Sequence, residues 1–238
     1  MKAFLLAAGL GTRLKPITNE MPKCLVHING RPLLEWWIDL LRKHNVSEVL
    51  INLHHLPEKV VEFLSRNSNH IKFNYYYEEK LLGSAGTLRM NKDFVKGEKE
   101  FFILYADNLT NIDLTEFKNF HNSHSFPFSM ALFHSQNPKA CGIAELDAES
   151  LIIDFEEKPK EPKSDLASAG IFISSPDILE LIPNNNLTDI GYDLIPKLVG
   201  KMKGWITGDY LLDIGTHQNL KKAEMEWPNV IRRSYYGL

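Results

Sequence analysis

The sequence predicts an α/β protein, a Rossmann-like three-layer sandwich with a mainly parallel, mixed sheet, and three observations lead to this class. Short apolar, β-rich runs alternate with segments whose apolar residues recur at helical spacing. A glycine-containing turn directly follows the first apolar run, at the place where open α/β sheets bind ligands. The chain of 238 residues, 44% of them apolar, is large enough for one domain with a buried core.

Strands and helices alternate most regularly in the first half of the chain. The two longer helices expected there begin at Pro32 and Pro57, and proline is favoured in a first helical turn. Because parallel neighbours need a crossover connection, this alternation predicts βαβ units. The predicted strands are residues 3–7, 48–53, 71–77 and 101–106, and the predicted helices are residues 32–44, 57–66 and a short one before the last of these strands.

After residue 107 the pattern becomes more antiparallel and mixed. No internal repeat and no linker divides the chain, so we expect one domain over residues 1–238. No hexapeptide repeat occurs, so we expect no β-helix acyltransferase domain. The predicted strands are residues 128–134, 141–146, 151–156, 167–174 and others near 204–213, and the predicted helices are residues 113–123, about 176–182, 189–201 and 215–227.

Composition excludes several classes of partner. A formal net charge of -3 gives no field that attracts nucleic acid or an anionic membrane, so we expect neither. No apolar run approaches the roughly 18 residues of a membrane span. Cys24 and Cys141 are interpreted as two free thiols in a reducing compartment rather than as one bridge. The apolar start is too short for a signal peptide, so we expect a cytoplasmic protein.

The strongest local motif is Ala-Gly-Leu-Gly-Thr-Arg-Leu at residues 8–14, directly after the first strand. Its glycines let backbone N–H groups approach a phosphate. Thr12 adds a hydroxyl donor, and Arg13 adds a planar cation suited to phosphate oxygens. The motif fits neither the dinucleotide fingerprint nor the Walker A pattern, and the alternative is a simple tight turn. Lys23 could fold back onto the same phosphates, although alone it would be read as a surface charge.

Residues 9–18, Gly-Leu-Gly-Thr-Arg-Leu-Lys-Pro-Ile-Thr, followed by Pro22-Lys23, resemble the signature of the sugar-1-phosphate nucleotidyltransferases. The resemblance implies the nucleotide-diphospho-sugar transferase type of fold, with a nucleotide-binding half over residues 1–110 and a sugar-phosphate-binding half over residues 111–238. It implies Arg13 and Lys23 as catalytic residues. The nucleotide-binding residues that it implies are Leu6, Ala8, Gly9, Gly11, Thr12, Arg13, Lys23, Gly83, Ser84 and Ala85.

Two further features occur in the order of the family. Residues 83–87, Gly-Ser-Ala-Gly-Thr, resemble the segment that lies against the nucleobase, and they also fit a helix N-terminus capped by Ser84. Asp107 and Asp213 resemble the carboxylate pair that holds Mg²⁺, a hard cation that prefers oxygen ligands. Without the resemblance, Asp107 would be read as a turn former and Asp213 as a buried, hydrogen-bonded acid.

The second half of the chain carries the sugar side of the resemblance. The Glu-Lys-Pro segment at Glu157 resembles one in which the glutamate accepts sugar hydroxyls and the lysine, here Lys158, binds the sugar phosphate. Without the resemblance this segment would be a charged surface turn. The segment at Gly142 resembles the family's strand that lies beneath the sugar, with Cys141 where the family has an aromatic residue. Ser168 stands where the family has an asparagine that touches the sugar.

The reaction implied by the resemblance joins a nucleoside triphosphate to a sugar 1-phosphate and releases pyrophosphate, with Mg²⁺ as cofactor. The segments around Lys23 and Asp107 favour GTP with mannose- or heptose-1-phosphate. UTP or dTTP with a glucose-type sugar is the alternative, and a catalytically silent regulatory paralogue is another. A monomer and a homo-oligomer both remain open. His44, His54 and His55 do not have a zinc spacing and are interpreted as surface or second-shell residues.

Overall fold

The computed structural model describes residues 1–68, 70–185 and 187–236. The chain forms two compact units. Unit 1 comprises Met1–Phe4, Leu81–Leu104 and Leu114–Gly208, and unit 2 comprises Leu5–Lys80, Tyr105–Asp113 and Asp209–Leu238. The two units interleave along the sequence, so each half of the chain contributes to both.

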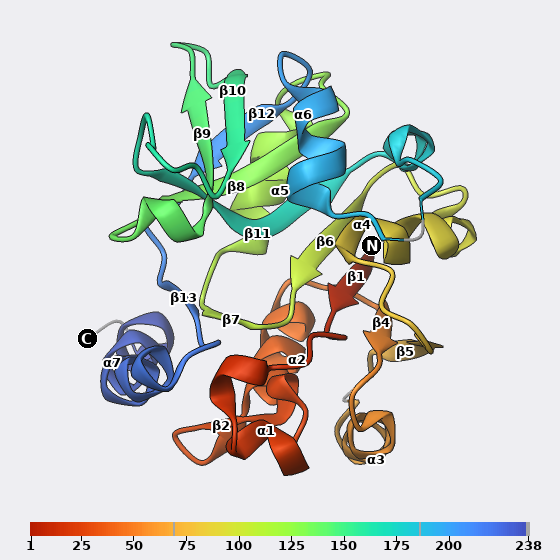
Figure 1. Cartoon of the computed structure of the whole chain (residues 1–238), viewed down its shortest axis with the longest axis vertical. Helices are drawn as coiled ribbons and strands as arrows, with labels where there is room; N and C mark the ends of the chain where they lie inside the picture. Colours follow the sequence, from red (N-terminus) through yellow and green to blue (C-terminus); the bar gives the residue numbers. More distant parts are fainter. Residues whose placement is uncertain (69, 186, 237–238) are drawn as a thin grey trace. The chain divides into compact units, whose positions relative to one another are not determined.

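Unit 1 is built on a mixed sheet around the long strand β11 (Figure 1). β11 pairs in antiparallel fashion with β6, β8 and β9, while β12 runs parallel to β8. β9 and β10 form an antiparallel pair with Glu157 opposite Gly142. The strands are β1 (Lys2–Leu6, in part), β6 (Phe101–Tyr105), β8 (Phe128–His134), β9 (Gly142–Leu146), β10 (Ile152–Glu157), β11 (Leu166–Ser174) and β12 (Lys203–Ile206).

The helices of unit 1 are short. α5 (Leu114–Asn122) packs on β8 and β12, where Phe117 stacks on Trp205 with ring centroids 5.2 Å apart. The segment expected as one helix over 189–201 is a π-helical turn, Ile190–Leu194, followed by α6 (Ile195–Leu198). The remaining elements are α4 (Ser84–Met90) and the 3-10 turns Lys92–Val95, Pro138–Ala140 and Pro176–Leu181.

Unit 2 contains the parallel pair of β4 (Glu48–Leu53) and β5 (Lys72–Tyr77), beside which α3 (Pro57–Asn67) lies (Figure 1). α2 (Leu33–Lys43) buries six apolar residues at helical spacing, so one face of it belongs to the core. The buried residues of that face are Leu33, Leu34, Trp37, Ile38, Leu40 and Leu41.

The other elements of unit 2 are mostly short. Two small antiparallel ladders join β2 (His27–Ile28) to β3 (Arg31–Pro32) and β7 (Asn108–Thr110) to β13 (Leu211–Asp213). β13 falls within the strands predicted near residues 204–213, whereas β2, β3 and β7 were not predicted, because two or three residues carry no periodicity. The helical turns are Thr12–Leu14, α1 (Ile17–Glu20) and Lys23–Leu25.

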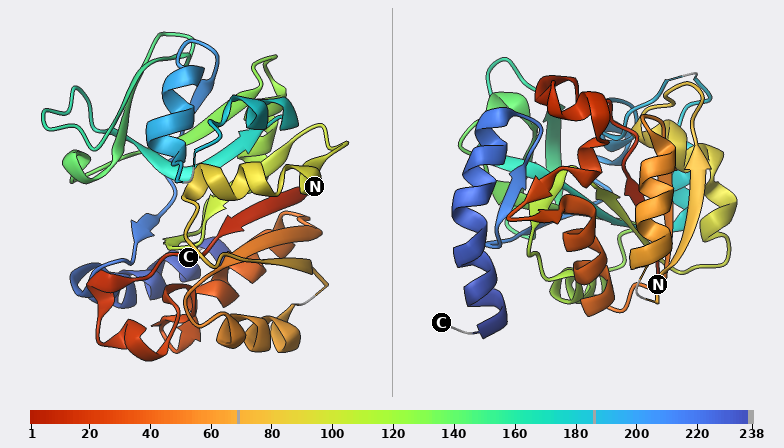
Figure 2. Two further views of the ribbon diagram at one scale, coloured as in Figure 1. Left: turned by 45° about the vertical axis from the view of Figure 1, so that its right-hand side comes forward. Right: turned by 90° about the horizontal axis from the view of Figure 1, so that it is seen from below.

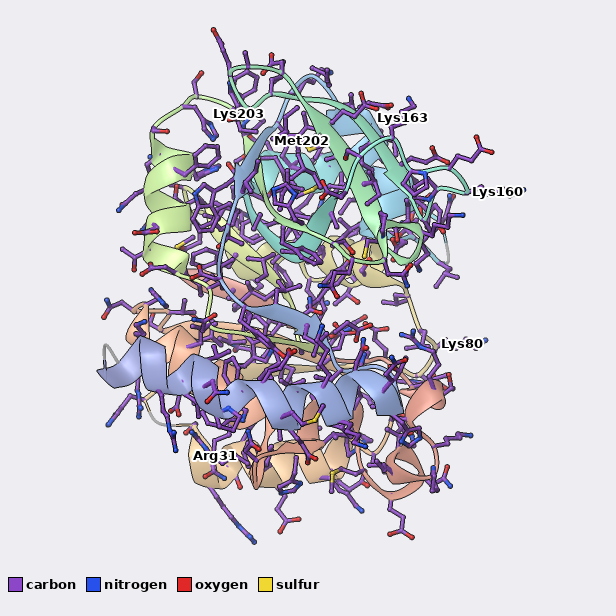
Figure 3. The ribbon with its side chains drawn as sticks, turned by 90° about the vertical axis from the view of Figure 1, so that its left-hand side faces the viewer. Arg31, Lys80, Lys160, Lys163, Met202 and Lys203 are labelled. Atoms are coloured by element: carbon purple, nitrogen blue, oxygen red, sulfur yellow. The ribbon has the colours of Figure 1, made fainter. Side chains whose placement is uncertain are left out.

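The last helix, α7 (His217–Tyr236), is longer than predicted and is drawn in blue in Figure 2. The expected end at residue 227 was wrong, because the helix continues through Pro228. A proline removes one backbone N–H from a helix, and here packing outweighs that loss. Trp227 is buried and meets Trp36 of α2 edge-to-face with ring centroids 5.4 Å apart. Arg31, labelled in Figure 3, lies 3.9 Å over the ring of Trp36.

The mixed sheet with its helices confirms the predicted α/β class. Cys24 and Cys141 are free thiols, as expected. Burial raises the pKa of the Cys24 thiol to about 12. Among the residues that the structure describes, no helix is long and apolar enough to cross a membrane.

Candidate functional site

The loop after β1 is held by its own hydrogen bonds. Gly11 adopts a φ of 62°, in the left-handed region that favours glycine. A side chain there would also place its Cβ 2.8 Å from Thr18 Cγ2. The Gly11 carbonyl accepts hydrogen bonds from Leu14 N at 2.9 Å and from Thr18 Oγ1 at 2.8 Å. The loop is therefore a fixed turn whose glycine has a local structural reason, and it presents Arg13 on its exposed side.

Asp107 and Asp213 lie close together because of the small β7–β13 ladder. Asp213 pairs with Asn108 in that ladder, and Ile214 N donates to the Asp107 carbonyl at 3.2 Å. The ladder thus joins the end of β6 to a segment more than one hundred residues later. Gly215 N donates to Asp213 Oδ1 at 2.8 Å and fixes that carboxylate. The two predicted metal acids therefore share one place in unit 2.

Lys23 lies between these two carboxylates. Its Nζ is 2.8 Å from Asp107 Oδ2 and 2.8 Å from Asp213 Oδ1, and its side chain is only 8% exposed. Burial by itself lowers the pKa of a lysine, but the attraction of Asp107 and Asp213 outweighs it, so the pKa of Lys23 is raised. Lys23 is therefore a charged, buried cation rather than a solvated surface lysine.

Arg13 reaches the same cluster from the loop. Its Nη2 lies 3.5 Å from Asp213 Oδ2, and its side chain is 66% exposed. A contact this long at an exposed position holds the guanidinium only weakly. Arg13 can consequently turn toward an anion, whereas Lys23 is fixed.

The acid pair fits a divalent cation. Both carboxylates approach one nitrogen atom to 2.8 Å, so they are close enough to share a single cation, and both side chains are more than 40% exposed. Mg²⁺ typically takes one or two carboxylates and completes its shell with waters and substrate phosphates. Within residues 1–68, 70–185 and 187–236, no group of three or more His, Cys, Asp or Glu residues could hold a metal. Two exposed carboxylates are the kind of donor set that a divalent cation with an open coordination shell uses.

Unit 1 brings together the residues predicted for the sugar. Glu157 lies at the end of β10, and its Oε2 would be 2.5 Å from a Cβ added to Gly142. Gly191 confines the same carboxylate from the other side, with Glu157 Cδ 2.8 Å from a Cβ added there. Lys158 Nζ lies 3.7 Å from Glu157 Oε1. Burial raises the pKa of Glu157, Asp189 adds to the rise, and Lys158 partly opposes it.

The Gly-Ser-Ala segment packs against another loop of the same unit. Ala85 N donates to the Thr188 carbonyl at 3.1 Å, and Ser84 Oγ donates to Asp189 Oδ2 at 2.8 Å. Helix α4 does begin here, but Ser84 is its first residue and makes no cap. The interpretation of Ser84 as an N-cap was therefore wrong: its hydroxyl binds Asp189 instead. A Cβ on Gly83 would collide with the Thr188 carbonyl, which explains this glycine.

The other predicted residues belong to the same two units. In unit 2, the Leu6 carbonyl accepts from Ala106 N at 3.0 Å, and Ala8 is buried. A Cβ on Gly9 would meet nothing within 4 Å, and Thr12 begins the first helical turn. In unit 1, Ser168 Oγ accepts from Gly170 N at 3.3 Å on β11.

Sequence reasoning missed three residues of these sites. Thr188 and Asp189 in unit 1 follow no motif, and Gly191 is a lone glycine near the π-helical turn. No pattern in one sequence could have singled them out, because their partners lie far along the chain.

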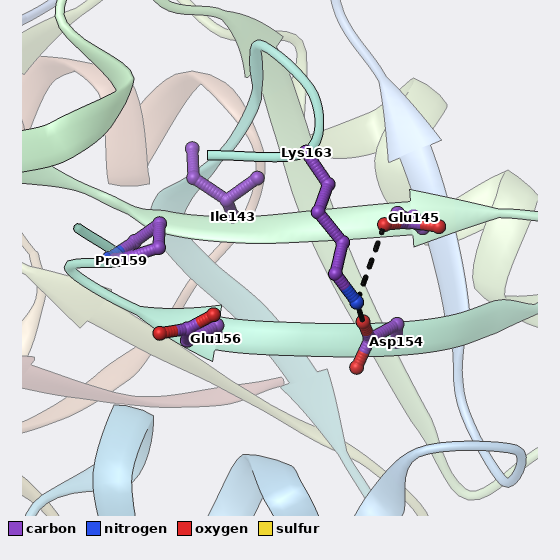
Figure 4. Close-up of a pocket in the computed structure, with 6 residues that line it drawn as sticks. All are labelled: Ile143, Glu145, Asp154, Glu156, Pro159 and Lys163. Carbon is purple, nitrogen blue, oxygen red and sulfur yellow. Dashed lines mark hydrogen bonds and ion pairs between the residues drawn. The ribbon is translucent and has the colours of Figure 1, made fainter. Parts of the chain in front are cut away.

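A hollow on the β9–β10 ladder is not part of either group (Figure 4). It is crossed by Lys163, whose Nζ lies 2.6 Å from Asp154 and 3.9 Å from Glu145. Successive side chains of a strand point to opposite faces, so Asp154 and Glu156 share this face while Glu157 points to the other. The hollow is a surface ion-pair site and does not contact the Glu157 carboxylate.

Comparisons with known proteins identify the family of this chain. The family model described as nucleotidyl transferase matches residues 2–229. A UTP–glucose-1-phosphate uridylyltransferase of Synechocystis is 31% identical over 84% of this chain and 55% of its own length. Mannose-1-phosphate guanyltransferase 2 of Candida glabrata is 30% identical over 90% of this chain and 61% of its own. The chain thus spans a little over half the length of the curated relatives it matches.

A solved structure is similar over nearly the whole chain. A glucose-1-phosphate thymidylyltransferase candidate of Bacillus anthracis, in complex with sucrose, superposes with a TM-score of 0.85 and 27% identity. The similarity covers 94% of each chain. The family model, which covers most of the chain, shows that this chain belongs to the nucleotidyl transferase family.

Proposed function

We propose that the protein joins a nucleoside triphosphate to a sugar 1-phosphate, giving a nucleoside-diphosphate sugar and pyrophosphate. The observation that carries the proposal is the cluster of Lys23, Asp107 and Asp213, which come from three distant segments and meet within 2.8 Å. A buried cation between two accessible carboxylates suits a reaction between two anionic substrates. The cation can stabilise the negative charge of the phosphates, and the carboxylates can hold a metal ion at the same place.

The proposed chemistry is an in-line displacement. A phosphate oxygen of the sugar 1-phosphate attacks the α-phosphorus of the triphosphate, and the bond from that phosphorus to the bridging oxygen of pyrophosphate breaks. No protein nucleophile is needed, because the attacking phosphate is already anionic at neutral pH. Catalysis then consists of positioning and charge stabilisation.

Each cation has a role in this proposal. Lys23 holds the α-phosphate, and Arg13, which is weakly held and exposed, turns to the α- and β-phosphate oxygens. Lys158 binds the phosphate of the sugar. Asp107 and Asp213 would hold Mg²⁺, which offsets the repulsion between the two anionic substrates when bound.

The groups of unit 1 are proposed to bind the sugar and the base. Glu157, enclosed by Gly142 and Gly191, accepts sugar hydroxyls. Its close confinement supports this role, because a carboxylate that cannot turn away discriminates between hydroxyl positions. Ser168 lies near the sugar, and residues 83–85 line the base.

The proposal also covers specificity for the nucleobase and the sugar. We favour GTP with mannose- or heptose-1-phosphate, and relatives of both the guanyl and uridylyl type leave UTP or dTTP as the alternative. A panel of triphosphates against sugar 1-phosphates, scored by pyrophosphate release with Mg²⁺, tests this. The highest kcat/KM is expected for GTP with a mannose-type sugar. Turnover with no pair, despite binding, would identify a catalytically silent regulatory paralogue.

We also propose that the enzyme acts in the cytoplasm, as a monomer or a homo-oligomer, without nucleic acid or membrane partners. Two cysteines that form no disulfide and a net charge of -3 support this setting.

Glu157→Gln gives the first testable prediction. Burial raises the pKa of Glu157, so the unfolded chain releases this proton at a lower pH than the folded protein does. The wild type therefore loses stability as the pH rises through that range, and the glutamine variant does not. We expect the variant to have the higher Tm at about pH 7.5 and a smaller advantage near pH 4.

The same variant should bind the sugar 1-phosphate more weakly, seen as a raised KM. Glu156→Gln is the matched control, because Glu156 is exposed on the opposite face of β10. A Tm difference that is the same at both pH values would show that ionisation of Glu157 is not the cause.

A further inference from the structure

We propose that Asn52, supported by Glu78, and His55 are positioning residues that hold the two ends of the triphosphate-binding loop. The inference rests on the proposed function, because it assigns a task to that loop. Asn52 lies near the end of β4, His55 follows this strand, and Glu78 follows β5. All three belong to unit 2 together with the loop.

Asn52 holds the start of the loop. Its Oδ1 accepts a hydrogen bond from Ala7 N at 2.7 Å, and its Nδ2 donates to Glu78 Oε1 at 2.8 Å. Asn52 is 4% exposed and Glu78 is 3% exposed, so both bonds are shielded from water. Only one orientation of the amide satisfies both neighbours, since the backbone N–H can only donate and the carboxylate accepts. Glu78 therefore fixes which end of the amide faces Ala7.

Glu78 is itself held in place. Its backbone N donates to the Leu53 carbonyl at 2.8 Å, which continues the β4–β5 pairing. Its carbonyl contacts His54 Nδ1 at 2.7 Å. The support of Asn52 thus comes from the β4–β5 pair.

His55 holds the far end of the loop. Its Nε2 lies 2.7 Å from the Thr18 carbonyl, and a carbonyl only accepts, so this nitrogen carries the proton. Thr18 in turn donates through Oγ1 to the Gly11 carbonyl. Residues 7 and 18 are therefore both tied to the end of β4, one on each side of Arg13.

Fixing both ends has a consequence for the reaction. Ala7 and Thr18 do not themselves need to touch a phosphate, but they set where the backbone N–H groups between them point. A misplacement of about 1 Å in such groups can reduce the rate by about 10²-fold. Asn52 and Glu78 thereby act on the substrate through the loop.

Asn52→Asp tests the inference. It replaces the donor facing Glu78 by a second carboxylate, which repels the first. We expect kcat/KM for the triphosphate to fall by about 10- to 100-fold, with weaker triphosphate binding by calorimetry. In the double variant Asn52→Asp with Glu78→Gln, the introduced amide donates to one oxygen of the introduced carboxylate, and the other oxygen accepts from Ala7 N. Rescue to within about threefold of the wild type is expected.

Controls separate positioning from general stability. Val60→Ala, in the buried face of α3, should lower the Tm while leaving triphosphate affinity and KM unchanged. His55→Ala changes a half-buried position and should also weaken triphosphate binding. If Asn52→Asp does not fold, His55→Ala takes its place in the test.

The outcomes distinguish two failures. If the wild type binds no nucleoside triphosphate, the proposed function is wrong. If the wild type binds one while Asn52→Asp, or His55→Ala in its place, binds it equally well, the positioning role is wrong. If Val60→Ala also binds the triphosphate weakly, so that affinity falls in proportion to Tm in every variant, the positioning role is likewise wrong.

Discussion

Replacing Lys23 with methionine is expected to lower kcat/KM for pyrophosphate release by about 10²–10³-fold, the usual effect of losing one preorganised charge donor. Lys23 is the group best placed to have this effect. Its ammonium is buried against the two carboxylates and lies at the cluster before any substrate arrives, whereas Arg13 is exposed and weakly held. Arg13→Ala is therefore expected to lower kcat/KM as well, by about 10²-fold, the lower end of that range.

The same Lys23→Met variant should bind a divalent cation more tightly in the absence of nucleotide. The ammonium of Lys23 lies against both predicted metal acids, so an arriving cation has to compete with it. Removing one opposing charge at this distance should raise Mn²⁺ affinity by roughly tenfold or more. Titration followed by electron paramagnetic resonance of free Mn²⁺ measures this without any turnover.

Lys72→Met is the control for both measurements, because Lys72 pairs with Glu48 on the surface of β5 and is 71% exposed. Unchanged turnover in Lys23→Met would remove the phosphate role of Lys23. Unchanged or weaker Mn²⁺ binding would show that Asp107 and Asp213 do not hold the metal.

The fold was predictable wherever the burial of an element produces a recognisable pattern of apolar residues in the sequence. β4 and β8 have the predicted bounds, residues 48–53 and 128–134, because nearly every residue in them is buried and most of those residues are apolar. The start of α3 at Pro57 was also predicted, because proline suits the first helical turn. Where proline stands inside a helix the same reasoning failed, since the rest of α7 compensates for Pro228.

The candidate site was predictable as a set of residues but not as a set of contacts. The loop motif pointed to Arg13 and Lys23, and the family resemblance supplied Asp107 and Asp213. That Lys23 pairs with both acids depends on the β7–β13 ladder, which is three residues long on each side. Ladders this short leave no signal in a single sequence. Asn52 was missed for a related reason: a buried asparagine in a strand is visible, but its partner at residue 7 is not.

Gly215→Ala is expected to reduce activity about 10²-fold while leaving the fold intact. A Cβ at residue 215 would lie 2.7 Å from Lys23 Nζ, 2.8 Å from Arg13 Nη2 and 2.8 Å from Asp213 Oδ1. Three groups of the candidate site therefore crowd this one position. The lysine and arginine atoms are ends of long side chains, so they can move aside without disturbing the core, but they then leave their positions around the acid pair.

Differential scanning calorimetry and a pyrophosphate-release assay together test this prediction. The Tm should change little and the kcat/KM should fall, a combination that a general packing defect does not produce. Gly208→Ala is the matched control, since a Cβ there meets nothing within 4 Å and both measurements should stay at wild-type values. A Gly215→Ala variant with full activity would mean that Lys23 and Arg13 leave the acid pair before the reaction anyway. The arrangement of these side chains in the free enzyme would then not be the one that acts on the substrates.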